Sequence, residues 1–61
     1  MPIIDVKLFE GRLTAETSPV LIEKFTDVLV DVFGEGIRQY TTVLLSEVAP
    51  QHWGHNGKPY G

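Results

Sequence analysis

The sequence predicts an α/β (α+β) fold, in which a single βαβ unit with parallel strands is followed by a short C-terminal hairpin. Three observations predict it. Apolar and charged residues alternate at the start of the chain, apolar residues recur every three or four positions in the middle, and a second β-rich run precedes a glycine-rich tail. Because a helix that connects two adjacent strands of one sheet makes them parallel, this order indicates a right-handed crossover.

The first strand is expected over residues 2–9. Charged residues separate Ile4, Val6 and Leu8, so one face of the strand is apolar and the other is polar. The strand ends at a Glu-Gly-Arg run, where Gly11 can turn the chain at low steric cost.

The helix is expected to begin at Thr17 or Ser18 and to end near Phe33. A hydroxyl side chain can cap a helix, and Pro19 is tolerated in the first turn because its missing N–H has no helical partner there. Gly34 follows the last apolar position, as is common where helices end. The apolar stripe consists of Leu21, Ile22, Phe25, Val28, Leu29, Val32 and Phe33.

A second strand is predicted over residues 41–48, where β-branched and apolar residues dominate, and Pro50 ends it. In the tail, Asn56-Gly57 favours a tight turn and therefore a short hairpin, which Pro59 confines to an edge. A helix of about 16 residues is roughly as long as a seven-residue strand, so the two suit a βαβ unit.

The chain is too small to bury a core of its own. It has 61 residues, 43% of them hydrophobic, and a fold of this size buries only about 60% of its unfolded surface. It has no cysteine, so no disulfide compensates. Apolar residues remain outside the main patterns at Ile3, Phe9, Val20 and Val30, which predicts that neighbouring subunits cover them.

Charge and hydropathy argue against several partners. Five Lys and Arg residues against eight Asp and Glu residues leave a net charge of −3, the wrong sign for a protein that binds nucleic acid. No apolar run reaches the roughly 18 residues of a membrane span, and the N-terminus lacks the basic start of a signal peptide. We expect a cytoplasmic protein with neither a membrane nor a nucleic-acid partner.

The sequence contains none of the common metal or nucleophile patterns. His52 and His55 lie in a glycine-rich tail without nearby carboxylates, which favours surface histidines over a zinc site. Ser18 and Ser46 lack a base at a recognisable spacing, and the run 34–36 is too short for a dinucleotide-binding loop. From these residues we therefore expect neither a metal site nor a phosphate-binding loop.

Two residues nevertheless carry possible chemistry. Pro2 follows Met1, and removal of that methionine leaves a secondary amine, a group whose ordinary pKa of about 8 suits a general base. Arg12 follows the first strand, at the edge of a βα unit where ligands tend to bind. Each has an ordinary alternative, since a proline at position two arises by chance and a loop arginine is usually solvated.

Taken together, these segments resemble the 4-oxalocrotonate tautomerase family. The resemblance covers nearly the whole chain and rests on the N-terminal Pro-Ile, the Glu-Gly-Arg at 10–12 and the His-Trp-Gly at 52–54. It implies one tautomerase-like domain over residues 1–61, assembled as a homohexamer (a trimer of dimers). It also implies an isomerase that moves a proton between the keto and enol forms of small anionic 2-oxo or enol acids, without a cofactor.

The resemblance assigns roles to four residues. Pro2 matches the catalytic base, and Arg12 matches an arginine that binds a substrate carboxylate. Phe9 and Trp53 match positions that line the apolar pocket. Trp53 replaces the usual phenylalanine, which keeps an aromatic wall and adds bulk and an indole donor.

One position departs from the family pattern. A second arginine is expected near the start of the second strand, where this chain has Thr42. The nearest arginine is Arg38, four residues upstream in a loop that is longer than the family norm. Arg38 either reaches the site as a substrate ligand or is a surface arginine that pairs with Glu35 or water.

This departure leaves other functions open. In a heterohexamer, a partner chain would supply the missing arginine. Related proline-dependent enzymes hydrate or dehalogenate unsaturated acids with the help of an acidic residue, for which Glu10 and Glu47 are the candidates, although structural or exposed roles suit both better. A non-catalytic oligomeric binding module is the last alternative, and it applies if Met1 stays on Pro2, whose nitrogen is then an amide.

Overall fold

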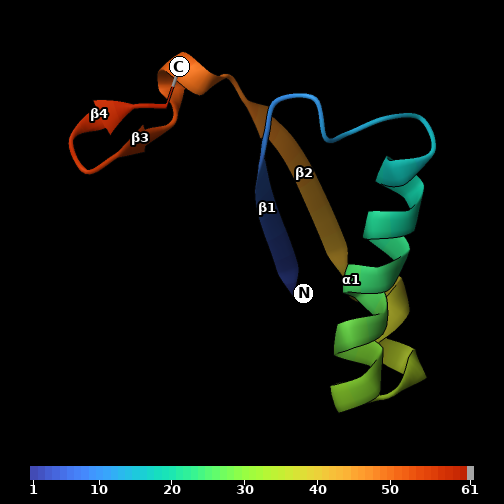
Figure 1. Ribbon diagram of the computed structural model, residues 1–61. Helices are drawn as coiled ribbons and strands as arrows, with labels where there is room; N and C mark the ends of the chain where they lie inside the picture. The colour runs from blue at the N-terminus through green and yellow to red at the C-terminus, as the bar shows by residue number, and fades with distance from the viewer. Residues whose placement is uncertain (61) are drawn as a thin grey trace.

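The protein folds as a βαβ unit with a separate small hairpin, as a computed structural model of residues 1–60 shows (Figure 1). The predicted fold class is confirmed, because the two long strands are parallel and the helix lies between them in the chain. The elements are β1 (Ile3–Phe9), α1 (Thr17–Phe33), the 3-10 helix η1 (Glu35–Tyr40), β2 (Thr42–Val48), the 3-10 helix η2 (Pro50–His52), β3 (Gly54–His55) and β4 (Lys58–Pro59).

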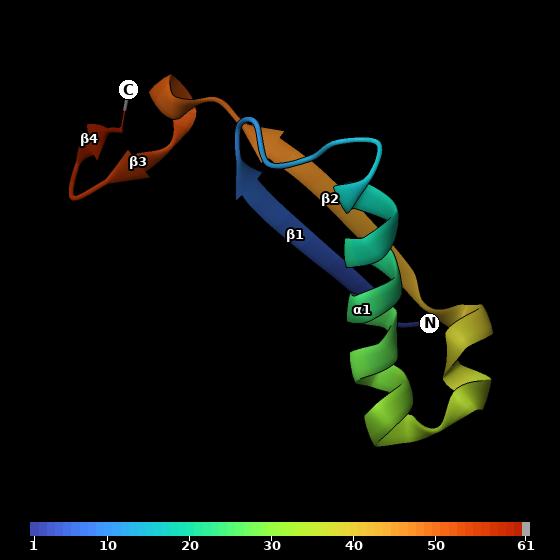
Figure 2. The same ribbon diagram turned by 45° about the vertical axis from the view of Figure 1, so that its right-hand side comes forward.

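The sheet of β1 and β2 is covered on one face only. Its register runs from Ile3 beside Thr42 to Phe9 beside Val48. Half-buried and exposed residues alternate along most of β1, so the predicted apolar face lies under α1 while the opposite face is open (Figure 2). Ile3, on that open face, leaves 65% of its surface exposed.

Helix α1 begins at Thr17 as predicted, but neither Thr17 nor Ser18 caps it. The hydroxyl of Thr14 accepts hydrogen bonds from the backbone N–H groups of Glu16 (3.2 Å) and Thr17 (3.0 Å). The Thr17 hydroxyl instead donates to the carbonyl oxygen of Arg12 at 3.0 Å. The cap oxygen therefore comes from the turn before the helix, and Thr17 joins that turn to the loop after β1.

The segment between α1 and β2, which was predicted as a loop, forms the 3-10 helix η1 instead. Gly34 has a φ of 95°, which suits glycine, and its N–H donates to the carbonyl of Val30 at 2.8 Å. The hydroxyl of Thr41 donates to the carbonyl of Ile37 at 2.8 Å where η1 meets β2. The chain thus passes from helix to strand through a defined turn.

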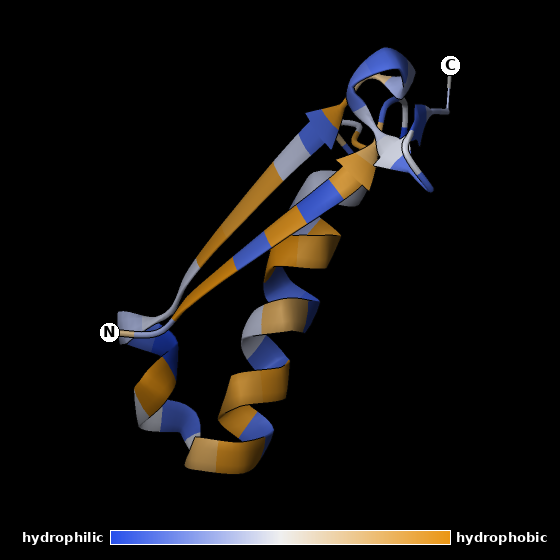
Figure 3. Cartoon of the chain, turned by 90° about the vertical axis from the view of Figure 1, so that its left-hand side faces the viewer, coloured by the Kyte–Doolittle hydropathy of each residue, from blue (hydrophilic) through white to orange (hydrophobic). Residues whose placement is uncertain are grey.

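The apolar stripe of α1 is wider than the sheet that it covers. Leu29 is half-buried, whereas Val28 and Val32 leave 56% and 70% of their surfaces exposed, and Figure 3 shows hydrophobic residues along the whole length of α1. In residues 1–60 no hydrophobic side chain is fully buried, and the buried residue is Thr26, at 8% exposure. The hydroxyl of Thr26 is satisfied by the carbonyl of Ile22 at 2.7 Å.

The chain is more extended than a compact monomer of its length. Its radius of gyration is 14.3 Å, against about 10.5 Å for a compact domain of this size. Its accessible area is 4641 Å², whereas a compact monomer of this mass exposes about 4,000 Å². These values match the expectation that one chain cannot close its own core. None of the helices in residues 1–60 is both long and apolar enough to cross a bilayer.

The predicted C-terminal hairpin is confirmed and lies beyond the end of the main sheet (Figure 1). Asn56 and Gly57 form its turn with φ values of 53° and 78°, and positive φ at both positions is what a tight two-residue hairpin turn requires. The N–H of Tyr60 donates to the carbonyl of Trp53 at 2.9 Å, which closes the base of the hairpin.

Candidate active site

Pro2 lies at the start of β1, next to the start of β2. Its carbonyl oxygen accepts a hydrogen bond from the N–H of Thr42 at 3.0 Å, and the residue is half-buried. Thr42, the position where a second arginine was expected, is therefore a neighbour of Pro2. At this position the chain has a hydroxyl in place of the expected cationic side chain.

Arg12 lies at the opposite end of β1 from Pro2. The strand between them has seven residues and spans about 20 Å, whereas an arginine side chain extends about 7 Å. Arg12 is exposed, and its guanidinium makes no hydrogen bond or ion pair within residues 1–60. The fold thus brings the two predicted site residues to different ends of one subunit.

Glu47 holds the loop that carries Arg12. Its Oε2 atom accepts hydrogen bonds from the N–H groups of Gly11 at 2.8 Å and Leu13 at 2.9 Å. Sequence reasoning named Glu47 as a candidate acid but favoured a structural or exposed role, and its bonds to residues more than 30 positions away had no local signal. Because it accepts two backbone hydrogen bonds, the carboxylate of Glu47 has a structural role.

Aromatic rings gather where β1 ends and the hairpin begins. The rings of Phe9 and Trp53 meet edge to face with centroids 5.6 Å apart, so the two predicted pocket residues are brought together. Tyr60 stacks on Trp53 at 6.4 Å and also lies 6.1 Å from Phe9, and His55 stacks on Tyr60 at 5.7 Å. Tyr60 and His55 were missed as site neighbours because their contacts depend on how the hairpin folds back.

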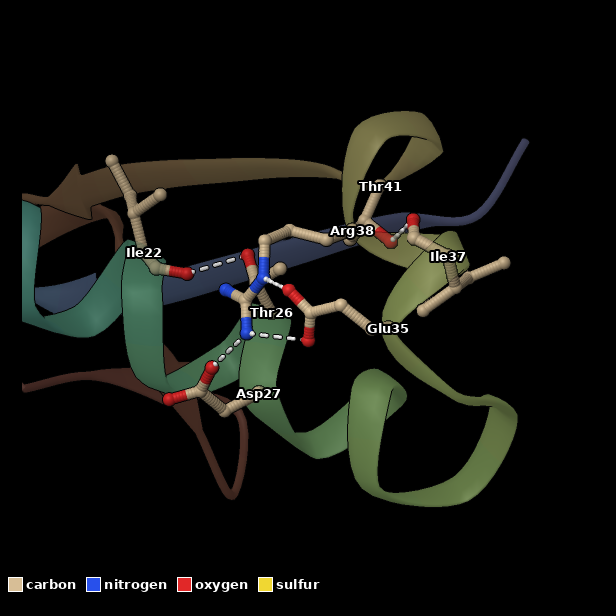
Figure 4. Close-up of polar contacts among 7 residues, drawn as sticks. All are labelled: Ile22, Thr26, Asp27, Glu35, Ile37, Arg38 and Thr41. Carbon is tan, nitrogen blue, oxygen red and sulfur yellow. Dashed lines mark hydrogen bonds and ion pairs between the residues drawn. The ribbon is translucent and has the colours of Figure 1, made fainter.

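Arg38 is held by two carboxylates (Figure 4). Its Nε donates to Glu35 Oε1 at 2.7 Å, and its Nη2 donates to Asp27 Oδ1 at 2.8 Å. These bonds, to Glu35 first and then Asp27, raise the pKa of Arg38 above its ordinary value. The pairing with Glu35 that was one of the two predicted alternatives is present, and Asp27 extends it from η1 to α1.

A single chain supplies residues of the predicted site, but they do not form an enclosed pocket within residues 1–60. The described residues 1–60 form no pocket, and among them no three His, Asp or Glu side chains gather as metal ligands would. The pieces are Pro2 at one end of β1, and at the other end an arginine, Arg12, without a side-chain partner in residues 1–60, and an aromatic group. Within residues 1–60 of one chain, these pieces lie too far apart to contact one small molecule together.

Comparison with known proteins places these pieces in context. A family model described as "Tautomerase enzyme" matches residues 2–61. A probable tautomerase of Staphylococcus aureus (strain Mu50 / ATCC 700699) is 39% identical over 57 residues, which cover 93% of this chain and 90% of the relative. A probable tautomerase of Dickeya dadantii (strain 3937) is 33% identical over 58 residues, or 95% and 85% of the two chains.

Solved structures agree with these relatives. The crystal structure of TomN, described as a 4-oxalocrotonate tautomerase homologue in the tomaymycin biosynthetic pathway, has a TM-score of 0.84 and 27% identity, over 97% of this chain and 88% of that one. YwhB, described as a homologue of 4-oxalocrotonate tautomerase, also has a TM-score of 0.84, with 30% identity over 97% of this chain and 93% of that one.

Proposed function

Because the chain belongs to the tautomerase family, we propose that it is a keto–enol tautomerase of small anionic 2-oxo or enol acids, with Pro2 as the general base. The observation that carries the proposal is that the family model matches the chain from Pro2 onward. Met1 must be removed first, since the nitrogen of an internal proline is a tertiary amide without basicity.

The proposed reaction moves a proton within the substrate, from one carbon to another in a 2-oxo acid or from the enol hydroxyl to carbon in a 2-hydroxydienoate. The neutral amine of Pro2 removes a proton from the carbon next to the substrate carbonyl, and the resulting ammonium returns that proton to another carbon of the dienol. The ordinary pKa of an α-amino group is about 8, and an apolar or cationic site lowers it, which increases the fraction of free base at neutral pH. No cofactor is needed for this step.

The proposed site is shared between subunits. Pro2 and Arg12 of one chain are separated by the length of β1, about 20 Å, so both contact one small substrate only if they come from different chains. Arg12 would bind the carboxylate remote from the reacting carbon, because a planar guanidinium binds two oxygens at once. Phe9 and Trp53 would exclude water from that end.

A homohexamer, a trimer of dimers, is the proposed assembly. The exposed side of the α1 stripe and the open face of the sheet both need a neighbour, and one interface cannot cover two separate faces. A heterohexamer is the alternative that the sequence favours at Thr42, because a partner chain would then supply the second arginine. Co-purification from the native host with a second short chain at equal stoichiometry would establish the heterohexamer.

Arg38 is the weakest proposed ligand. To bind substrate it would have to leave both Glu35 and Asp27, which hold it at 2.7 and 2.8 Å. We therefore assign the carboxylate of the substrate to Arg12. Hydration by the same proline remains a second candidate, but one oxygen of Glu47 already accepts two backbone bonds and Glu10 is exposed.

The test combines the N-terminus with one substitution. Mass spectrometry of the native protein should show a chain without Met1. Pro2→Ala should lower the tautomerisation of a 2-hydroxydienoate by about a hundredfold or more while the assembly persists, since positioned acid–base groups contribute this much. Pro19→Ala, in the first turn of α1, is the matched control and should turn over normally. Unchanged turnover in Pro2→Ala, or a native chain that retains Met1, would refute the proposed base.

A further inference from the structure

The backbone on both sides of Arg12 is bound to one oxygen atom. Glu47 lies next to the end of β2, beside Leu8 in the sheet register, and its Oε2 accepts bonds from Gly11 N at 2.8 Å and Leu13 N at 2.9 Å. A carboxylate makes stronger hydrogen bonds to N–H groups than a neutral acceptor does. The turn after β1 is thereby attached to β2, and Arg12 is at its centre.

The carbonyl of Arg12 has a separate anchor. The Thr17 hydroxyl donates to it at 3.0 Å and accepts from the N–H of Thr14 at 2.8 Å, which ties the turn to the start of α1. Gly11 has a φ of 95°, a backbone conformation that glycine adopts without strain. Three consecutive residues thus have a fixed backbone, while the guanidinium of Arg12 makes no contact of its own within residues 1–60.

We infer that Glu47 is a positioning residue, which fixes the direction in which Arg12 presents its guanidinium to a substrate carboxylate in a neighbouring subunit's site. The inference rests on the proposed function, since it deepens the role given there to Arg12. Arginine is long and rotamer-rich, so a fixed backbone decreases the entropy lost on binding and keeps the planar fork aligned. Glu47 itself does not touch the substrate.

The two bonds to a single oxygen make this role separable from acid–base chemistry. A carbonyl oxygen has two lone pairs, so Glu47→Gln can accept both N–H groups without a charge. Glu47→Met has a similar length and no comparable acceptor. If Glu47 positions Arg12, the glutamine variant keeps function and the methionine variant loses it, whereas an acid that activates water would fail in both.

The experiment measures steady-state kinetics on a 2-oxo dicarboxylate and its monocarboxylate analogue. Glu47→Met should raise KM for the dicarboxylate by about tenfold, since loss of positioning commonly costs this much or more, with little change for the analogue. Glu47→Gln should stay within about threefold of the wild type on both substrates. Glu23→Met, an exposed glutamate of α1, is the matched control and should behave as wild type.

Amide hydrogen exchange gives a readout that does not depend on activity. Protection of the N–H groups of Gly11 and Leu13 should fall in Glu47→Met and persist in Glu47→Gln. If the methionine variant does not fold, the protection of these two N–H groups can still be measured in Glu47→Gln. Loss of protection and of function in Glu47→Gln would overturn the inference, because a neutral acceptor would then be insufficient.

Arg12→Ala separates failure of this inference from failure of the proposed function. If Arg12→Ala raises KM for the dicarboxylate and Glu47→Met does not, the positioning role is wrong while the function of Arg12 stands. If Arg12→Ala leaves KM unchanged, the role of Arg12 is wrong and the inference falls with it. In the double variant that combines Arg12→Ala with Glu47→Met, the two increases in KM should not add, since both act through the guanidinium of Arg12.

Discussion

Val28 offers a direct test of whether α1 packs against another chain. It leaves 56% of its surface exposed on the part of the apolar stripe that the sheet does not cover. Complete burial of a valine stabilises by about 1.5 kcal/mol, so covering the exposed part contributes about 0.8 kcal/mol per subunit. Val28→Asp removes this contribution and also places an unpaired carboxylate in the interface, which costs several kcal/mol more in desolvation.

The same change has little effect on an isolated subunit. Position 28 is exposed there, and Lys24 lies one turn earlier on the helix, where an opposite charge is slightly favourable. We therefore expect the dissociation constant of the assembly to rise by about a hundredfold or more, because each 1.4 kcal/mol is a factor of ten. Val28→Ala should have a much smaller effect in the same direction.

Sedimentation velocity from nanomolar to high micromolar protein measures this shift. Ala15→Asp adds the same charge in the exposed turn before α1 and should leave the assembly unchanged. The reasoning is refuted if Val28→Asp assembles as tightly as the wild type. It is refuted equally if the wild-type chain is a stable monomer at micromolar concentration.

Arg38→Met should lower the Tm by a few degrees in low salt and by less in high salt, because partly exposed ion pairs are screened, and it should affect a dicarboxylate and its monocarboxylate analogue equally. A selective loss of dicarboxylate turnover would instead make Arg38 a substrate ligand. Trp53→Ala should raise KM severalfold through loss of its contact with Phe9, while Trp53→Phe retains most of it. Trp53 is the only tryptophan, so a substrate that leaves its fluorescence unchanged at saturation would argue against its place in the pocket.

The order of the elements follows from local sequence patterns and was predicted well. Alternation in β1 and the spacing in α1 report which face is apolar over a few residues, and they need no knowledge of the rest of the chain. The Asn56-Gly57 turn was predicted for the same reason, since its positive φ values depend on those two residues.

The errors concern features that depend on contacts between distant segments. Residues 35–40 form a 3-10 helix in which Arg38 pairs with Asp27, which is 11 positions earlier. Glu47 accepts hydrogen bonds from a turn more than 30 positions away, and the residues next to Glu47 in the sequence give no sign of these bonds. Pro2 and Arg12 were predicted as residues of one site, but the length of the strand between them places them at opposite ends of one subunit.

The register of the main sheet has a consequence for how the chain folds. Every pair of facing residues, from Ile3 with Thr42 to Phe9 with Val48, is separated by 39 positions in a chain of 61. The sheet therefore cannot form from a local hairpin, and pairing of its strands closes a long segment of chain that contains α1. Chains dominated by such distant pairings fold slowly, commonly over milliseconds to seconds. Refolding should thus show a slow phase that is independent of protein concentration, followed by a concentration-dependent phase as subunits associate.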